Sequence, residues 1–288
     1  MIAGIERCFF FSSRTLGLML AALASLALSP ELARAQTPAE HFSAYTAGST
    51  VTVDHSAWSR LLERYVVAES DGINRVRYAS MKKGARADLE GYLARLVRVD
   101  VKALDRNEQF AYWANLYNAK TIAIVLDALP VRSIKDINLG GGLLAAVTGG
   151  PWKAQVLKVA GVDLSLDDIE HGILRPVFKD PRVHYAVNCA SLGCPNLGRA
   201  AFTGAKLDAE LDAAATAFIN HPRGLRISDG EAVLSSIYSW FEEDFGGSAA
   251  AVLAHVSRYA GEALKSKLQG ISEIADYGYD WSLNDAGP

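Results

Sequence analysis

Apolar residues recur every three or four positions in several stretches of this chain, and this spacing predicts helices. The longest stretch begins after Asp105, a helix-capping residue followed by Glu108 in the position of a capping box, and Pro130 ends it. A shorter helix, capped by Ser165, is expected to end at Pro176. The same spacing predicts further helices over residues 57–68, 87–99, 205–220, 236–244 and 248–268.

Strand-like patterns are short and lie scattered between these helices. Short strands are expected at residues 75–78 and 154–160, and residues 225–234 form a hairpin around an Asp-Gly turn. Residues 182–187 are expected to form a buried strand that runs into a turn rich in Ser, Gly and Pro. This pattern predicts an α+β fold in which helices pack around a small, mostly antiparallel sheet.

The first 35 residues have the pattern of a secretory signal peptide. Arg7 and Arg14 precede or flank an apolar run over residues 16–28, which is too short to span a bilayer comfortably. A small-x-small sequence ending at Ala35 provides the cleavage site, and an uncleaved membrane anchor is the alternative. We therefore expect a periplasmic or secreted protein that carries no cofactor loaded in the cytoplasm.

Composition and charge bound the rest of the chain. Residues 36–52 are polar and small, as in a flexible lead-in, and residues 53–288 are expected to form a single globular domain. The chain is 50% hydrophobic and its net charge is −3, so it has neither a basic field for nucleic acid nor a polybasic membrane patch. No later segment has ~18 uninterrupted apolar residues, so we expect no membrane attachment after cleavage. The sequence does not indicate a partner.

A glycine-rich segment over residues 140–151 is the other conspicuous loop. It matches neither a phosphate-binding loop nor a dinucleotide-binding fingerprint, so no cofactor is expected there. A mobile loop is the simpler interpretation, and a substrate lid is the alternative.

Two cysteines remain after signal cleavage, Cys189 and Cys194, in the sequence HYAVNCASLGCP. Two cysteines this close often pair in an oxidising compartment, which predicts a Cys189–Cys194 disulfide. A thiol at the end of a buried strand is alternatively a nucleophile. No metal is expected, because one C-x4-C pair is a weak zinc signal. Disulfide-exchange proteins usually carry Cys-x-x-Cys beside a βαβ pattern, and neither occurs here.

Histidines on two segments are the candidate bases for such a nucleophile. His171 lies on the short helix after Ser165, and His184 lies on the expected strand before the cysteines. On a strand, His184 and Asn188 would share one face while Cys189 points to the other. A structural hydrogen-bonding role is the alternative for each histidine.

Polar residues also line one side of the longest predicted helix. Glu108, Asn115 and Asn118 follow one another at helical spacing among aromatic residues. Buried amides need hydrogen-bond partners, so this stripe is either the wall of a site or a set of solvent-facing amides with a capping Glu108.

Three motifs in order, YWANLYNAKTI, IEHGILRP and DPRVHYAVNCASLGCP, resemble the domain-of-unknown-function 547 (DUF547) family over about residues 107–222. That family has no settled activity. Its motif positions fall here on Glu108, Asn115, Asn118, Glu170, His171, Arg175, His184, Asn188, Cys189 and Cys194. From this resemblance Asn115, Asn118, Glu170 and Arg175 are expected to bind substrate.

A Cys and a His on separate segments are also similar to the catalytic pair of papain-like or transglutaminase-like thiol enzymes. The first hypothesis is a thiol-dependent hydrolase or acyltransferase. In it Cys189 attacks a carbonyl, His171 or His184 is the base, and Glu108 or Asn188 orients the base. The alternative is a non-enzymatic binding or scaffold domain in which a Cys189–Cys194 disulfide closes a loop.

Overall fold

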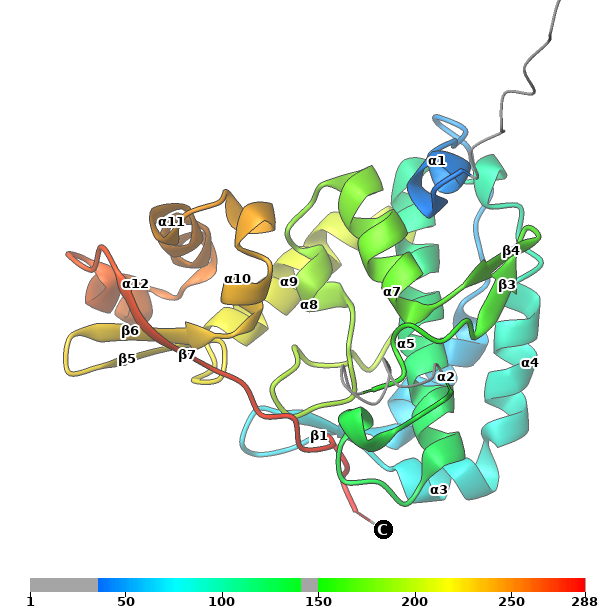
Figure 1. The fold of residues 1–288 in the computed structure, drawn as a ribbon, viewed down its shortest axis with the longest axis horizontal. Helices are drawn as coiled ribbons and strands as arrows, with labels where there is room; N and C mark the ends of the chain where they lie inside the picture. The colour runs from blue at the N-terminus through cyan, green and yellow to red at the C-terminus, as the bar shows by residue number, and fades with distance from the viewer. Residues whose placement is uncertain (1–35, 141–149, 288) are drawn as a thin grey trace, which may run out of the picture. The chain divides into compact units, whose positions relative to one another are not determined.

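The computed structural model describes residues 36–140 and 150–287. The predicted signal peptide and most of the glycine-rich segment therefore lie outside the described residues. From Gln36 onward the chain belongs to one compact unit, in which helices combine with three small sheets (Figure 1). This α+β architecture confirms the predicted fold class, although three separate sheets replace the single small sheet that was expected.

Helix α5 (Arg106–Ala128) is buried along most of its length and forms the centre of the larger hydrophobic core. Asp105 caps it as predicted, but the Asp105 carboxylate accepts from the N–H of Asn107, and Glu108 does not complete a capping box. Around α5 lie α1 (Pro38–Phe42), α2 (Ser56–Tyr65), α3 (Tyr78–Gly84), α4 (Arg86–Leu96), η1 (Val101–Ala103) and η2 (Ile134–Asp136).

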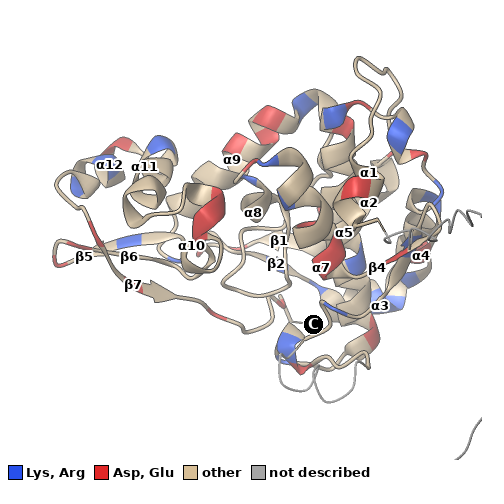
Figure 2. Ribbon diagram, turned by 45° about the horizontal axis from the view of Figure 1, so that its top comes forward, with Lys and Arg blue, Asp and Glu red and all other residues tan. Residues whose placement is uncertain are grey.

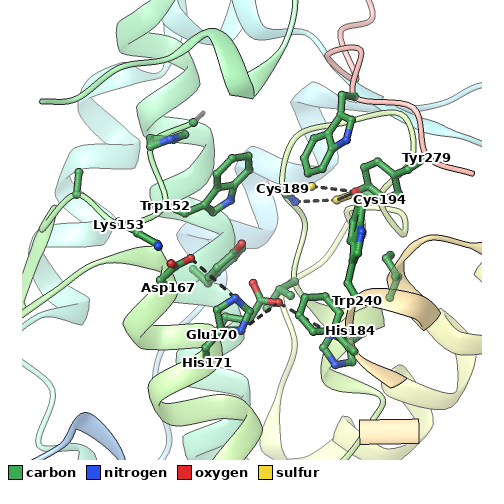
Figure 3. A pocket seen from close by; sticks show the side chains of 18 of the residues that line it. Trp152, Lys153, Asp167, Glu170, His171, His184, Cys189, Cys194, Trp240 and Tyr279 are labelled. Carbon is green, nitrogen blue, oxygen red and sulfur yellow. Dashed lines mark hydrogen bonds and ion pairs between the residues drawn. The ribbon is translucent and has the colours of Figure 1, made fainter. Parts of the chain in front are cut away.

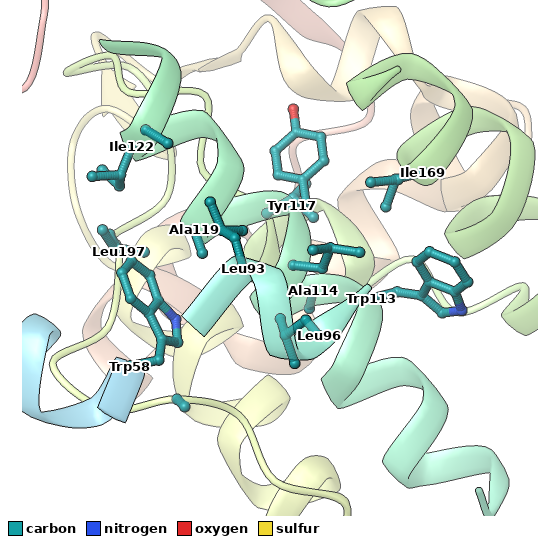
Figure 4. Close-up of a cluster of buried hydrophobic side chains, with 14 of the residues drawn as sticks. Trp58, Leu93, Leu96, Trp113, Ala114, Tyr117, Ala119, Ile122, Ile169 and Leu197 are labelled. Carbon is teal, nitrogen blue, oxygen red and sulfur yellow. The ribbon is translucent and has the colours of Figure 1, made fainter. Parts of the chain in front are cut away.

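The packing around α5 uses large side chains from neighbouring helices. In the buried cluster, Leu93 and Leu96 of α4 lie near Ala114 of α5, and Trp58 of α2 lies beside Leu197 (Figure 4). Each of these side chains is almost fully buried, and burial of such a side chain contributes about 1.5–3 kcal/mol.

The expected flexible lead-in, residues 36–52, packs onto this core instead. Thr37 and Glu40 form a capping box at the start of α1, and Phe42 is buried with its ring 4.9 Å from that of Trp113. The apolar Phe42 anchors a segment whose polar composition otherwise resembles a loop.

A second hydrophobic core lies at the other end of the unit, around a three-stranded sheet. The predicted hairpin is confirmed as β5 (Leu225–Ser228) and β6 (Glu231–Ser235), which pair antiparallel. Strand β7 (Ile274–Gly278), which the sequence reading did not include, pairs parallel with β6. The helices of this part are α9 (Leu207–Ile219), α10 (Ile237–Trp240), η5 (Glu242–Phe245), α11 (Ala249–Tyr259) and α12 (Glu262–Leu268).

Two further hairpins complete the strands of the described residues. They are formed by β1 (Val66–Ala68) with β2 (Asn74–Val76), and by β3 (Leu157–Val159) with β4 (Val162–Leu164). The helix predicted over residues 57–68 thus ends three residues early, where its β-branched residues enter β1.

Two predicted elements around the cysteines are wrong. Ser165 caps α7 (Leu166–Ile169) as expected, but the helix continues as a π-helix, η3 (Glu170–Phe178), through Pro176. The expected strand over residues 182–187 is instead a single helical turn, α8 (Val183–Ala186). Its residues are buried on every side, and so short an apolar run does not distinguish a strand from a buried helix.

In the described part of the chain, acidic and basic residues are interspersed along the helices (Figure 2). Among the helices of residues 36–140 and 150–287, none is long and apolar enough to cross a membrane.

Candidate functional site

A cavity of about 420 Å³ opens between three parts of the chain (Figure 3). They are the α7–η3 junction, the cysteine loop (residues 187–196) and the C-terminal segment (residues 279–284) together with α10. The reactive side chains that line the cavity are Asp167, Glu170, His171, His184, Cys189 and Cys194. Its aromatic lining consists of Tyr117, Trp152, Trp240, Phe241, Tyr279 and Trp281.

Two asparagines hold the cysteine loop in shape. Asn118 of α5 donates to the carbonyl of Ala186 (2.8 Å) and accepts from the N–H of Asn188 (2.8 Å). Asn188 in turn donates to the carbonyl of Pro195 (2.7 Å) and accepts from the N–H of Ala190 (2.9 Å). Because these backbone contacts occupy both amides, the predicted roles of substrate binding for Asn118 and base orientation for Asn188 do not fit the structure.

The C-terminal segment lies directly against the cysteine loop. The N–H groups of Leu192 and Gly193 donate to the carbonyls of Ser282 and Asp280, each at 2.8 Å. A Cβ on Gly193 would lie 2.8 Å from the Asp280 nitrogen, so only glycine allows this close approach. This contact brings Tyr279 to the two cysteines.

Both cysteines are free thiols in the structure, so the predicted disulfide is not formed here. Their sulfurs share the Tyr279 hydroxyl, which lies 3.1 Å from Cys189 Sγ and 3.2 Å from Cys194 Sγ. The backbone N–H of Cys189 donates to Cys194 Sγ at 2.9 Å. Ser191 Oγ lies 3.3 Å from Cys189 Sγ and donates to the Tyr279 hydroxyl at 3.0 Å.

These contacts favour the thiolate on Cys194. Burial opposes it, but hydrogen bonds from the Cys189 thiol, the Tyr279 hydroxyl and the Cys189 N–H outweigh burial and lower the pKa of Cys194 to about 7. The hydrogen bond to Cys194, followed by burial, raises the pKa of Cys189 well above its ordinary value. Burial also raises the pKa of Tyr279, so its hydroxyl stays protonated and able to donate. The sequence-based hypothesis therefore chose the thiol that is less readily ionised.

Arg223, which sequence reasoning did not single out, lies behind the cysteine loop. Its guanidinium donates to the carbonyl of Leu192 (2.9 Å) and to Asn196 (2.6 Å), while its Nε is buried without a partner among the described residues. Burial lowers the pKa of Arg223 to about 10, against the opposing attraction of Cys194 and Tyr279. This cation thus fixes the loop and interacts with Cys194.

His184 is buried in a well-defined hydrogen-bonded position. Its Nε2 lies 2.6 Å from Asp244 Oδ2, and its ring stacks on Phe241 with centroids 4.3 Å apart. Arg175 forms two further hydrogen bonds with Asp244, at 2.5 and 3.1 Å. Burial raises the pKa of Asp244, but the hydrogen bonds from His184 and Arg175 outweigh it and hold the pKa well below its ordinary value.

His171 occupies a more exposed position at the start of η3. Its Nδ1 lies 3.3 Å from Arg175 Nη1, and its Nε2 lies 3.8 Å from Asp167 Oδ1. Glu170 Oε1 is 4.0 Å from Nδ1 of both His171 and His184, so this carboxylate lies between the two imidazoles. Burial raises the pKa of Asp167. Arg175, expected to bind substrate, is engaged by Asp244 instead.

The predicted contact between a cysteine and a histidine is not present. Among the described residues, the hydrogen-bond partners of Cys189 Sγ are Ser191, Tyr279 and the Cys194 thiol, and neither histidine is a hydrogen-bond partner of either sulfur. The imidazole and thiol groups instead line the same cavity from different elements (Figure 3).

Like Asn118, Asn188 and Arg175, the predicted site residues Glu108 and Asn115 lie outside the cavity lining. Glu108 accepts from the backbone N–H of Val53 (2.8 Å) and of Gly204 (3.0 Å), at the start of η4 (Gly204–Lys206). Asn115 pairs with the backbone of Phe202, at 2.9 and 3.1 Å. Both side chains brace neighbouring segments against α5, which does not fit the roles of base orientation and substrate binding.

Aromatic side chains form the opposite wall of the cavity. The ring of Trp240 lies 4.8 Å from that of Tyr279 and stacks on Trp281 at 5.5 Å, and Trp152 lies 5.7 Å from Trp281. Trp240 remains 47% exposed, which is unusual for a tryptophan in contact with two other rings. In the sequence, the only indication of this wall is the pair of aromatic segments at residues 239–241 and 279–281.

Within residues 36–140 and 150–287, no group of three or more His, Cys, Asp and Glu side chains is arranged to hold a metal ion. The described residues that line the cavity include two thiols, two imidazoles, two carboxylates, the Lys153 amine and the hydroxyls of Tyr117 and Tyr279.

Comparison with known proteins gives one match. Residues 101–219 match the family model described as "Protein of unknown function, DUF547". No curated protein and no solved structure matches the chain. The match covers α5, the α7–η3 junction and the cysteine loop, in agreement with the resemblance of the three motifs, and residues 101–219 thus form a DUF547 domain.

Proposed function

We propose that the cavity is the active site of a thiol-dependent hydrolase or acyltransferase, with Cys194 as its nucleophile. One observation carries the proposal: Cys194 Sγ faces the cavity while a backbone N–H and a tyrosine hydroxyl both donate to it. A sulfur held by donors in this way is a thiolate near neutral pH and needs no contacting base to become nucleophilic.

The residues suit the two stages of acyl transfer. Cys194 Sγ forms a bond to the carbonyl carbon of the substrate, and the bond from that carbon to the leaving oxygen or nitrogen then breaks. His171, at the exposed side of the cavity, gives a proton to the leaving group and later takes one from the water that hydrolyses the thioester. Tyr279, relieved of the thiolate, donates to the oxygen that carries negative charge in the transition state.

The compartment and the substrate class follow from the sequence. The predicted signal peptide favours export to the periplasm or beyond, where peptides, amides and acyl groups of the cell wall are the natural substrates. The aromatic wall suits an acyl group with apolar or flat parts, because the exposed Trp240 and the half-buried Trp281 both line the cavity. A papain-like or transglutaminase-like relationship remains a hypothesis, since the Cys–His contact of those enzymes is not formed.

A non-enzymatic binding domain is the second candidate. The observation that favours it is the proximity of the two cysteines, whose sulfurs share one hydroxyl. In that case the pair forms a disulfide in the exported protein, and the cavity binds a ligand without reacting with it.

Acylation tests the choice between these functions. The reduced protein is incubated with p-nitrophenyl acetate and with a panel of peptide anilides, and the cysteine peptides are mapped by mass. The acyl group should appear on Cys194, and Cys194→Ala should lower turnover on the order of 10³-fold. Cys189→Ala should lower it by about tenfold, because it removes one donor to the thiolate. Undiminished turnover by Cys194→Ala, or no acylated cysteine with any probe, would overturn the proposal.

A further inference from the structure

The cavity is lined by two thiols that share one hydrogen-bond donor. A reaction with a single nucleophile would need only one of them. Cys189 Sγ and Cys194 Sγ both lie close to the Tyr279 hydroxyl, at 3.1 and 3.2 Å, and each also lines the cavity. Acyl transfer by Cys194 gives Cys189 only the minor role of a donor. The arrangement suits a reaction in which both sulfurs change bonds.

Thiol–disulfide exchange needs one thiolate that attacks and a second thiol that can reach the first sulfur. Cys194 meets the first condition, because the Cys189 N–H and the Tyr279 hydroxyl both donate to it. Cys189 meets the second, since its thiol contacts the same hydroxyl and interacts with the Cys194 thiol.

The loop that carries the thiols is held so that they stay together. Asn188 joins the two ends of the loop through Ala190 and Pro195, and Gly193 is pinned to the C-terminal segment. Ala190 adopts a left-handed conformation (φ 60°), which turns the chain directly after Cys189. The fold thus holds the two thiols together in a loop with four residues between the cysteines, whereas a Cys-x-x-Cys motif has two.

We propose that Cys189 and Cys194 form a dithiol–disulfide couple that reduces a disulfide bound in this cavity. Cys194 Sγ bonds to one sulfur of the substrate disulfide, whose S–S bond breaks, and the released thiolate takes the Cys189 proton through the Tyr279 hydroxyl. The Cys189 thiolate formed in this way attacks Cys194 Sγ. The protein–substrate S–S bond breaks, the second substrate thiolate leaves and takes a proton from water, and the protein holds a Cys189–Cys194 disulfide. The substrate disulfide gains the two electrons that the dithiol loses.

The cavity limits the substrate class. Its volume of about 420 Å³ admits a small organic disulfide or one disulfide-bearing turn of a peptide. The ring faces of Trp240 and Trp281 favour apolar groups beside the disulfide. This activity does not rest on the acyl transfer proposed above, although the two would use the same sulfur of Cys194.

Single-turnover exchange with bis(2-hydroxyethyl) disulfide tests the proposal on the reduced protein spanning residues 36–288. Wild-type protein should release two mercaptoethanol molecules and acquire an internal Cys189–Cys194 disulfide, which peptide mapping identifies. Cys189→Ser should stop at a mixed disulfide on Cys194 and release one molecule. Cys194→Ser should react about tenfold more slowly at neutral pH, because only the less ionised thiol remains. The variant without either cysteine is the matched control and should release none.

Two results would overturn the couple. One is wild-type protein that accumulates a mixed disulfide and never forms the internal bond. The other is Cys194→Ser reacting as fast as wild type. Alkylation of the wild-type protein by iodoacetamide, followed at each cysteine over pH, makes the same distinction without a variant, because Cys194 should react with an apparent pKa near 7. Failure of acylation by esters together with successful exchange would remove the acyl-transfer function and leave this one in place.

Discussion

The region that matches the family model and the region that follows it contribute differently to the cavity. Residues 101–219 supply the two thiols, the two imidazoles and the two carboxylates that line it. The later region supplies the groups that contact them: Asp244 on His184, and Tyr279 between the thiols. The matched region thus contains the thiols, imidazoles and carboxylates of the cavity, while the later region adds hydrogen-bond partners to His184 and to the two thiols.

The later region can affect these groups only at short range, because electrostatic effects on a pKa weaken with distance. A carboxylate or hydroxyl within hydrogen-bond distance shifts the pKa of a neighbour, whereas one beyond about 10 Å is screened by salt. The C-terminal segment must therefore lie directly on the cysteine loop to act on it. Gly193, which leaves no room for a Cβ beside Asp280, makes that contact possible.

The largest expected effect tests whether the matched region alone holds the loop. Asn118→Ala removes the partners of the Ala186 carbonyl and the Asn188 N–H, and leaving these buried groups unpaired should cost about 3 kcal/mol in the free energy of unfolding. Denaturant unfolding measures this loss. The released loop should also alter the relative rates at which Cys189 and Cys194 are alkylated.

Asn115→Ala is the matched control for that experiment. It also removes an amide that pairs with backbone, but at Phe202 rather than at the cysteine loop. A similar loss of stability with unchanged cysteine alkylation is expected. If Asn115→Ala altered the alkylation as much as Asn118→Ala did, the loop would not depend on Asn118 specifically.

Asp244 in the later region allows the second test, which concerns pH. Its pKa is depressed in the folded protein, so the carboxylate stabilises the fold above its ordinary pKa of about 4, and this contribution is lost as the pH falls further. Asp244→Asn should cost about 2 kcal/mol near neutral pH, because the hydrogen bonds with Arg175 and His184 lose their charge. The gap between variant and wild type should shrink as denaturant midpoints are measured down to about pH 3.

The neighbouring Glu243→Gln serves as the comparison, since Glu243 makes none of these contacts with His184 or Arg175. It should change stability by less than about 0.5 kcal/mol. A pH dependence of Asp244→Asn parallel to that of wild type would show that Asp244 does not carry the proposed charge interaction.

The same division explains how far sequence reasoning could go. The long helix, its Asp105 cap and the Ser165 capping box are local patterns, and they were predicted correctly. The cysteines and histidines were recognised because thiols and imidazoles are rare and reactive. The reasoning also required partners for the buried amides Asn115 and Asn118, but no local pattern indicates that those partners are backbone groups.

What the sequence could not provide depends on contacts between distant segments. Tyr279 lies 90 positions from Cys189 and 85 from Cys194, and nothing near either cysteine indicates it. The helical turn α8 was mistaken for a strand because four residues buried on every side show no periodicity. The expectation that His184 and Asn188 share one strand face, with Cys189 on the other, rested on that strand.

Tyr279→Phe gives the smallest of these effects and tests the comparison most directly. It removes one hydroxyl from the later region and leaves the ring against Trp240 and Trp281. The pKa of Cys194 should rise from about 7 toward its ordinary value, because one of its donors is lost. Alkylation of Cys194 at neutral pH should slow by about tenfold, equivalent to roughly 1.4 kcal/mol. The free energy of unfolding should change little, because Ser191 and the thiols can rearrange around the ring.

Tyr277→Phe is the control. Tyr277 lies in β7, two residues before Tyr279, and its hydroxyl contacts neither sulfur, so the variant measures the effect of losing a nearby hydroxyl. Its alkylation profile should match that of wild type. The opposite outcome is that Tyr279→Phe leaves the pH profile of Cys194 alkylation unchanged. In that case the contacts within the matched region, such as the hydrogen bond from the Cys189 N–H, would be enough to lower the pKa of Cys194. The later region would then shape the cavity without controlling its chemistry, and the two regions would differ in packing only.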